Sequence, residues 1–375
     1  MGPLQGLRIV EIAGLGAAPY GCMMLADMGA EVVRVERPGG PIDTPSDSPL
    51  LRNRRSVALD LKSPGGREAV LALAAKADVL IEGFRPGVAE RLGLGPQECF
   101  QRNPRLVYAR MTGWGQEGPL APRAGHDLNF IGLAGLLHQI GSLDGKPVVP
   151  LNVIGDFGGG GLLLAFGVMC AVWEAGRSGQ GQVVDASMLD GALSFMAMYF
   201  GYRHHGQFED RTGSHFLAGG AHFYDTYQTR DGYHLAVACI EPQFYQRFLT
   251  LMGLDSPRFR EAGYPAYGAD AAVNWAALKQ ELTEAFKRGT REEWCALFEN
   301  EDVCITPVLS LGEAAAHPHN RARRSFVDVG GIEQNAPAPR FSRTAPAHPT
   351  PPPAPGADTA EVFADWGITL PAAVR

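Results

Sequence analysis

The amino-acid sequence predicts an α/β protein, with a doubly wound parallel sheet in a large domain followed by a smaller α+β domain. In the first 185 residues, short runs rich in Val, Ile and Leu alternate with helical patterns, which is typical of repeated strand–helix–strand units. A stretch rich in Gly and His at 186–221 interrupts this order. A hairpin pattern, with the turn residues "RDG" at 230–232, then begins a second arrangement.

The elements of the large domain follow from hydrophobic periodicity and from turn residues. Ser63 and Pro64 are typical of a helix N-cap and of the first position of a helix. Strands are expected at 7–13, 31–36, 56–61, 78–84, 105–113 and within 181–187. Helices are expected at 18–29, 63–77, 87–93, 157–173 and 188–200. The segment 157–173 is short and Gly-rich enough to be a buried helix rather than a membrane span.

The expected domain boundaries follow from these elements. Residues 1–185 form the large domain, 186–221 a linker or crossover, and 222–329 the small domain, which also contains helices near 272–287 and 291–299. The Pro-rich tail 330–375 is expected to be extended and to return to the large domain.

Composition and charge exclude some classes of protein. The 375 residues carry a formal net charge of -7, which disfavours a nucleic-acid partner that needs overall positive charge. With 45% hydrophobic and 19% charged residues, the chain can bury a large core. The six cysteines form no CxxC pair and are expected to be buried thiols in a reducing cytosol. The N-terminus lacks a signal-peptide pattern, so we expect a cytoplasmic protein with no membrane partner.

Basic residues follow three of the expected strands. Arg37, Lys62 and Arg85 each come directly after a strand, and Arg91 lies in the next helix. Ligands of parallel sheets bind outside the carboxyl ends of the strands, so this placement predicts a site for a phosphorylated ligand. The alternative is that these are ordinary surface residues.

A second pattern after the first strand is weaker. Gly14 and Gly16 fit a dinucleotide-binding fingerprint, but Pro19 stands where a third glycine is required. A nicotinamide or flavin cofactor is therefore a minor alternative.

Three titratable residues are candidates for acid/base chemistry. His126 and Asp127 stand where a helix is expected to begin; free backbone N–H groups there favour negative charge, and a His suits a general base near neutrality. Asp156 precedes four glycines and is expected to be a helix N-cap whose glycines let a ligand approach closely. Glu241 precedes the helix-starting Pro242. Alternatively, His126 is a surface residue, and Asp127 and Glu241 only complement helix dipoles.

Segments along almost the whole chain carry a family resemblance. They include "LADMGAEVVRVERPGG", "DVLIEGFRPGVAERLGLGP", "AGHDLNFIGLAG", "NVIGDFGGGG" and "GGAHFYDTYQTRDGYHLAVACIEPQFY". With these motifs the sequence resembles the α-methylacyl-CoA racemases, a branch of the class III CoA-transferase superfamily. The resemblance implies an interlocked homodimer, in which the active site lies where the large domain of one chain meets the small domain of the other.

The resemblance also implies roles for individual residues. It makes His126 and Asp156 catalytic, gives Glu241 as the partner of His126, and assigns the backbone N–H of Asp127 to a developing oxyanion. Phe130 departs from the pattern, because many relatives carry Tyr there. The implied contacts with coenzyme A are Arg37, the strand residues Ala58, Leu59, Asp60 and Leu61, then Lys62, Arg85, Arg91, Gly125, Asp127, Leu128, Asn129 and Phe130.

The implied activity is the interconversion of (2R)- and (2S)-2-methylacyl-CoA through an enolate. Inversion at the α-carbon needs one acid/base group on each face, which is the reason for pairing His126 with Asp156. No metal and no cofactor are implied, since coenzyme A is part of the substrate. One alternative is a CoA-transferase with Asp156 as nucleophile, and another is a non-catalytic CoA-binding protein. His126 favours proton transfer, because transferases typically carry an aromatic residue at this position.

Overall fold

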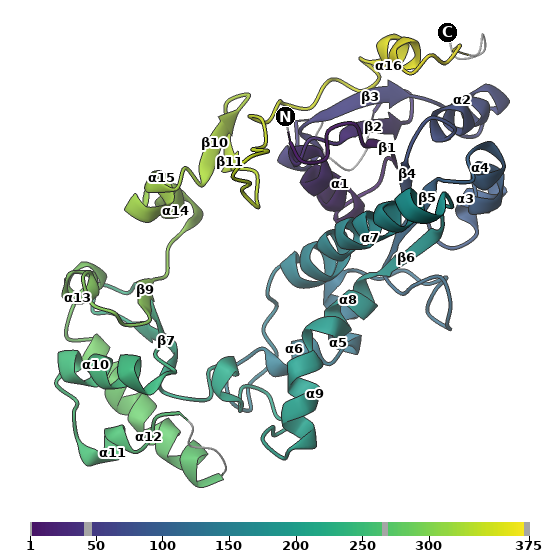
Figure 1. Ribbon diagram of the computed structural model, residues 1–375. Helices are drawn as coiled ribbons and strands as arrows, with labels where there is room; N and C mark the ends of the chain where they lie inside the picture. Colours follow the sequence, from purple (N-terminus) through teal and green to yellow (C-terminus); the bar gives the residue numbers. More distant parts are fainter. Residues whose placement is uncertain (1, 41–46, 265–268, 371–375) are drawn as a thin grey trace. The chain divides into compact units, whose positions relative to one another are not determined.

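The chain forms two compact units in a computed structural model that describes residues 2–40, 47–264 and 269–370 (Figure 1). Unit 1 comprises Met1–Ala134, Leu151–Phe195 and His319–Arg375, and unit 2 comprises Gly135–Pro150 and Met196–Pro318. These boundaries differ from the expected ones at 185 and 222. The chain changes units after Ala134, Pro150, Phe195 and Pro318, and no change in hydrophobic periodicity marks the first two passages.

Unit 1 contains a six-stranded sheet in the order β3-β2-β1-β4-β5-β6, and all neighbouring strands are parallel. The expected doubly wound parallel sheet is therefore confirmed. The chain starts in the middle of the sheet and reverses its direction of travel across the sheet between β1 and β4. The strands are β1 (Arg8–Ile12), β2 (Glu31–Glu36), β3 (Arg54–Ala58), β4 (Val79–Glu82), β5 (Val107–Thr112) and β6 (Val183–Ser187).

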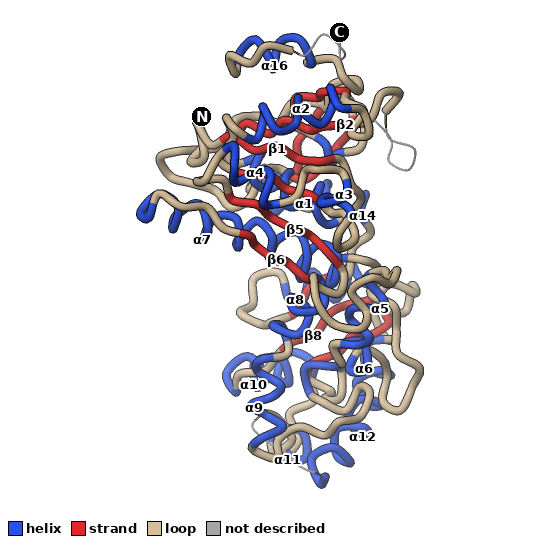
Figure 2. Tube along the Cα trace, turned by 90° about the vertical axis from the view of Figure 1, so that its right-hand side faces the viewer, coloured by secondary structure: helices blue, strands red, loops and turns tan. Residues whose placement is uncertain are grey.

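Two hydrophobic layers cover the sheet, one on each face. Helices, drawn in blue, lie around the red strands of this sheet (Figure 2). Alternate residues of a strand enter opposite layers, as the two-residue period requires: Ile9 packs in one layer and Val10 in the other. The layer around Val10 is covered by α2 (Pro64–Ala74), α4 (Pro96–Arg102) and α16 (Thr359–Asp365), and the layer around Ile9 by α1 (Ala17–Asp27) and α7 (Leu163–Ser178). Ser63 caps α2 by accepting the Gly66 N–H at 2.9 Å, as expected.

The apolar segment expected as one buried helix has two parts. Val153–Leu162 is a π-helix, η2, and α7 continues from it. By length and composition alone, Val153–Ser178 could cross a membrane, but 39% of the most apolar window is buried within the protein. The expectation of full burial is wrong, because Phe166 and Trp173 on the other face are 66% and 72% exposed.

The glycine run of η2 serves helix packing. A Cβ at Gly161 would lie 2.4 Å from the carbonyl oxygen of Ala17 in α1, and one at Gly159 would lie 2.8 Å from the backbone nitrogen of Ala192 in α8 (Met188–Phe195). Only glycine permits backbones to approach this closely. The glycines were expected to let a ligand approach closely. They instead let α1 and α8 approach η2 closely.

The C-terminal segment lies against unit 1. Arg52 is fully buried and donates from Nε to Asp27 at 2.9 Å and from Nη1 to the Gln334 side chain at 2.7 Å. Further along, Asp358 accepts the Ser56 N–H at 2.7 Å. The remaining elements of unit 1 are η1 (Pro49–Leu51), α3 (Val88–Arg91), α5 (Asp127–Leu133), the hairpin β10 (Phe326–Val329) and β11 (Ile332–Asn335), and α15 (Pro318–Ala322), whose first residue belongs to unit 2.

Unit 2 is built around a three-stranded antiparallel sheet, β7-β8-β9. The expected hairpin with its turn at 230–232 is confirmed in β7 and β8. The segment 186–221, expected as a linker or crossover, contains α8 and α9 (Ala197–His204), which overlap the helix expected at 188–200, and also η3 (Phe216–Ala218). The elements of unit 2 are α6 (Leu136–Gln139), α9 (Ala197–His204), η3 (Phe216–Ala218), β7 (Tyr224–Gln228), β8 (His234–Ala238), α10 (Pro242–Met252), α11 (Pro257–Arg260), α12 (Ala269–Phe286), α13 (Arg291–Phe298), β9 (Ile305–Pro307) and α14 (Leu311–Ala316).

The cysteines are all free, but their burial differs from the expectation. Cys22, Cys99 and Cys239 are buried, whereas Cys295 and Cys304 are half-buried. Cys170 is exposed on α7, on the face that the sheet does not cover.

Candidate active site

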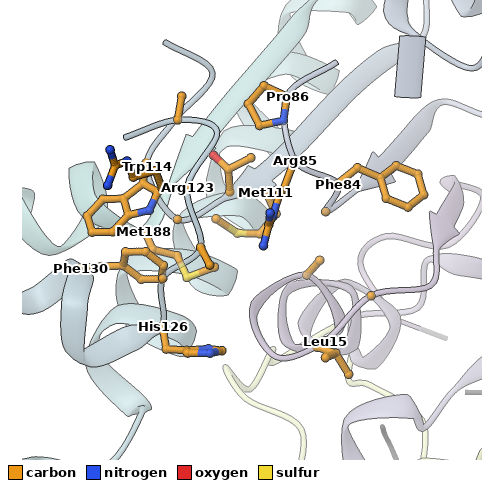
Figure 3. A pocket seen from close by; sticks show the side chains of 18 residues that line it. Leu15, Phe84, Arg85, Pro86, Met111, Trp114, Arg123, His126, Phe130 and Met188 are labelled. Carbon is orange, nitrogen blue, oxygen red and sulfur yellow. The ribbon is translucent and has the colours of Figure 1, made fainter. Parts of the chain in front are cut away.

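Two neighbouring cavities open at the carboxyl end of the unit 1 sheet. The Arg37 cavity, of about 610 Å³, is lined by residues that follow β1, β2 and β3. The His126 cavity, of about 310 Å³, is lined by residues that follow β1, β4 and β5 (Figure 3). Gly14 and Leu15 after β1, and Phe84 after β4, line both cavities. These are the two strands at which the sheet order reverses, where ligands of open α/β sheets bind.

Several of the predicted coenzyme A contacts line these cavities. Arg37, Lys62 and the residues Leu59, Asp60 and Leu61 line the Arg37 cavity. Arg85, Gly125, His126 and Phe130 line the His126 cavity. Strand-end placement therefore brought basic side chains to one end of the sheet, as the sequence predicted.

Other predicted contacts lie elsewhere. Strand β3 spans Arg54–Ala58, so the expected strand 56–61 begins and ends too late in the sequence. Ala58 lines neither cavity and donates its N–H to Thr359 at 3.1 Å in the C-terminal segment. Arg91 is the last residue of α3 and lines neither cavity. Asp127, Leu128 and Asn129 of α5 also line neither cavity; Asp127 is buried, and Leu128 and Asn129 are exposed.

His126 is the N-cap residue of α5, so the helix begins at Asp127, as expected. Its backbone N–H donates to the Asn129 side chain at 3.0 Å, which fixes the start of the helix. The imidazole is exposed at the edge of the cavity (Figure 3). The Asp127 N–H occupies the first helical position, where no intrahelical acceptor exists.

An aromatic pair supports the loop that carries His126. The rings of Trp114 and Phe130 meet edge to face, with centroids 4.7 Å apart. Gly113 and Gly125 lie against them, because a Cβ there would come within 2.1 Å and 2.7 Å of ring atoms. Phe130 is 2% exposed, so it packs beneath the loop and offers the cavity only a small part of its ring.

Sequence reasoning missed Trp114, Arg123 and Met111, which also line the His126 cavity (Figure 3). Met111 lies near the end of β5 and Trp114 in the loop after it, so their position at the carboxyl end of a strand was a signal, although neither residue is basic. Arg123 gave a signal too, since it stands three residues before His126 in "PRAGHD".

Asp156 was expected to be a helix N-cap, but it lies within η2. The N-cap residue of η2 is Asn152. The Asn152 side chain donates to Asp156 Oδ2 at 3.0 Å. A Cβ at Gly16 would lie 3.5 Å from the same oxygen, so the carboxylate sits beside the segment that follows β1. The Asp156 backbone N–H donates to Asp127 Oδ2 at 2.8 Å. His126 and Asp156 are thus carried by two segments that Asp127 joins.

Asp127 is 4% exposed, and the pKa of its carboxyl is shifted. Burial raises its pKa, the backbone N–H groups of Asp156 and Gly155 lower it, and the negative charge of Asp156 raises it; the net direction is upward.

Glu241 belongs to unit 2, where it is the N-cap residue of α10 with Pro242 at the first helical position. Its side chain is exposed and makes no capping hydrogen bond. Across the described residues of both units, no group of three or more His, Cys, Asp or Glu side chains could hold a metal ion.

Comparison with known proteins agrees with this arrangement. Residues 4–359 match the family described as CoA-transferase family III, and the chain belongs to this family. It is 43% identical to the alpha-methylacyl-CoA racemase of Mus musculus over 98% of this chain and 94% of that protein. The alpha-methylacyl-CoA racemase of Homo sapiens is 40% identical with the same coverage. A CAIB/BAIF family protein from Brucella suis has a similar crystal structure, with a TM-score of 0.83 and 28% identity over 97% of this chain and 99% of that one.

Proposed function

We propose that the protein is an acyl-CoA racemase that interconverts (2R)- and (2S)-2-methylacyl-CoA: one of the residues His126 and Asp156 removes the α-proton, and the other donates a proton to the opposite face of the carbon. The observation that carries the proposal is the hydrogen-bonded link between a cavity residue, His126, and a second titratable residue, Asp156, which does not itself line the cavity. His126 lines the cavity at the N-cap of α5, and Asp156 is tied to the next residue of that helix by a 2.8 Å hydrogen bond. The similarity to racemases over almost the full chain supports the same activity.

The two cavities suit the two ends of an acyl-CoA thioester. Arg37 and Lys62 are exposed cations on the larger cavity and bind phosphate groups of coenzyme A. The pantetheine arm crosses the wall shared by the cavities at Leu15 and Phe84 and brings the thioester to His126.

Proton transfer then takes two steps. One of the two groups removes the α-proton, and the electron pair moves onto the thioester oxygen to give an enolate. The Asp127 N–H, without an intrahelical acceptor, donates to this oxygen. The other group returns a proton to the opposite face of the carbon, so that the configuration inverts.

The proposal includes a homodimer in which Glu241 of one chain orients His126 of the other. Family resemblance supports this assembly, and Glu241 has an exposed side chain in a unit distinct from that of His126. Sedimentation of the active protein as a species of about twice the 40.2 kDa chain mass is the expected result.

A CoA-transferase remains the second candidate, because Asp156 could attack the thioester as a nucleophile. The test is to incubate one purified enantiomer of a 2-methylacyl-CoA with the enzyme and to follow its optical activity, with no acceptor acid added. A racemase converts the sample to equal amounts of both enantiomers. A transferase leaves the configuration intact until an acceptor is supplied, and a CoA-binding protein leaves it intact in either condition.

A further inference from the structure

The side chain of Asp127 makes contacts that the proposed reaction does not use. The reaction uses only the backbone N–H of this residue, yet the carboxyl is 4% exposed and points away from solvent. Its Oδ2 accepts the backbone N–H of Asp156 at 2.8 Å. Its Oδ1 is buried and, among the described residues, has no hydrogen-bond partner. A buried carboxyl with one oxygen unpaired is costly, so its retention calls for a reason.

The chain around Asp156 is shaped to receive this carboxyl. A Cβ at Gly155 would lie 2.4 Å from Asp127 Oδ2 and 3.0 Å from Asp127 Cγ. A glycine at 155 therefore allows the side chain to reach the backbone of η2. Asp156 is in the first turn of η2, where backbone N–H groups lack intrahelical acceptors, and Asp127 supplies an acceptor from a different helix.

We infer that the Asp127 carboxyl is a positioning residue that holds Asp156 in register with His126, and that it governs the Asp156 half of the proton transfer. This inference rests on the proposed function. His126, Asp127 and the hydrogen bond to Asp156 form one continuous connection between the two acid/base groups. Loss of the connection would leave α5 and His126 in place and free the backbone of Asp156 to shift.

The charge state of Asp127 is compatible with this role. Burial is the largest influence on its pKa and acts upward, together with the negative charge of Asp156. Oδ2 can accept the Asp156 N–H whether the carboxyl is neutral or ionised, so the connection survives protonation. The amide of Asn has nearly the same shape and also offers an acceptor oxygen.

The experiment compares two substitutions at this position. Asp127→Ala removes the acceptor and keeps the backbone N–H, whereas Asp127→Asn keeps an acceptor oxygen. Asp78→Ala is the matched control, because Asp78 Oδ2 accepts a backbone N–H from Arg8 at 2.9 Å. Asp78 precedes β4 at the amino end of the sheet, opposite the end where both cavities open.

The readout is the exchange of the α-proton for deuterium, followed by NMR for each enantiomer of a 2-methylacyl-CoA. Asp156→Ala and His126→Ala first identify which enantiomer depends on which base. Asp127→Ala should slow the Asp156-dependent exchange by about 10- to 100-fold, the scale of a misplaced catalytic group, and leave the other exchange unchanged. Asp127→Asn should restore most of the rate. Asp127→Ala and Asp127→Asn should bind coenzyme A as tightly as the wild type does. Asp78→Ala should exchange both enantiomers at the wild-type rates.

Equal slowing of both enantiomers, or an Asp127→Asn variant as slow as Asp127→Ala, would overturn the positioning role. Absence of α-proton exchange in the wild type would instead refute the proposed function itself. If Asp127→Ala does not fold, Asp127→Ser replaces it, because its hydroxyl is too short to reach the backbone of Asp156.

Discussion

Two sets of basic residues in or just after strands β2 and β3 of unit 1 differ in burial and in role. Arg34 in β2 and Arg54 in β3 are 2% and 5% exposed, and both pair with Glu11 of β1. Arg37 and Lys62, just beyond the ends of these strands, are exposed on a cavity wall. The first set stabilises the fold through a buried ion-pair network, and the second is available to a ligand. Arg34 also borders the Arg37 cavity, but it is buried against Glu11, so burial and pairing separate the two sets.

Glu11, the carboxylate partner of the buried Arg34 and Arg54, should have the largest effect on stability. Burial alone would raise its pKa, but Arg54 and Arg34 outweigh burial and hold the pKa below its ordinary value. Glu11→Ala leaves two buried guanidinium groups without this partner, which should lower the free energy of unfolding by about 3–5 kcal/mol. Hydrogen exchange of the β2 and β3 amides measures this opening free energy.

The control for this variant is Glu68→Ala. Glu68 pairs with Arg102 at 2.9 Å, but both side chains are nearly half exposed, so its loss should cost less than about 1 kcal/mol. A cost for Glu11→Ala as small as that for Glu68→Ala would remove the distinction between the two sets.

Glu82 sharpens the comparison, because it is buried with much weaker pairing. Its carboxylate accepts the Phe84 N–H at 2.6 Å, and Arg110 Nε lies 3.7 Å away. Burial raises its pKa to about 7. Since this value exceeds the ordinary value of 4.5, its contribution to stability is complete below pH 4.5 and is lost as the pH rises through 7.

Glu82→Gln should therefore remove a pH dependence worth up to about 3 kcal/mol. Relative to the wild type, the variant should gain unfolding free energy between pH 5 and pH 8. Hydrogen exchange of the β4 and β5 amides at both pH values checks this expectation. Parallel pH profiles for the two proteins would show that Glu82 does not titrate in this range.

The exposed set should affect binding and leave stability unchanged. Arg37→Ala and Lys62→Ala should each weaken coenzyme A binding by about 1–3 kcal/mol, the range for a hydrogen bond to a charged group. Their thermal midpoints should match the wild type, because neither side chain is buried. Calorimetric titration with coenzyme A at two salt concentrations makes the measurement. A drop in stability with unchanged binding would place these residues with the buried set.

Arg91 should give the smallest effect among the predicted phosphate contacts. It lines neither cavity, whereas Arg85 lines the His126 cavity. Arg91→Ala should weaken coenzyme A binding less than Arg85→Ala does in the same titration. The reverse order would mean that the ligand path leaves the cavities near α3.

The sequence predicted those features that depend on local pattern. Hydrophobic periodicity predicted all six parallel strands. The position directly after an expected strand identified Arg37, Lys62 and Arg85 as cavity residues. The pairing of Asp156 with Asp127 joins residues 29 positions apart and leaves no periodic signal.

The sequence pattern also did not predict the close backbone packing of η2 against α1 and α8. The glycines at 158–161 matched a helix N-terminus that lies open to a ligand, but they lie where η2 meets α1 and α8. A glycine run shows that a side chain is excluded, without showing whether a ligand or another helix excludes it.

In the proposed mechanism, His126 and Asp156 each serve one face of the same α-carbon. This mechanism is tested most directly by NMR of α-proton exchange in heavy water for both enantiomers, with the wild type, His126→Ala and Asp156→Ala. We expect exchange of both enantiomers by the wild type, and a loss of about 10²- to 10⁴-fold in racemisation for either variant. Each variant should retain exchange of a different enantiomer. Full racemisation by His126→Ala, or a covalent acyl group trapped on Asp156 during turnover, would contradict it.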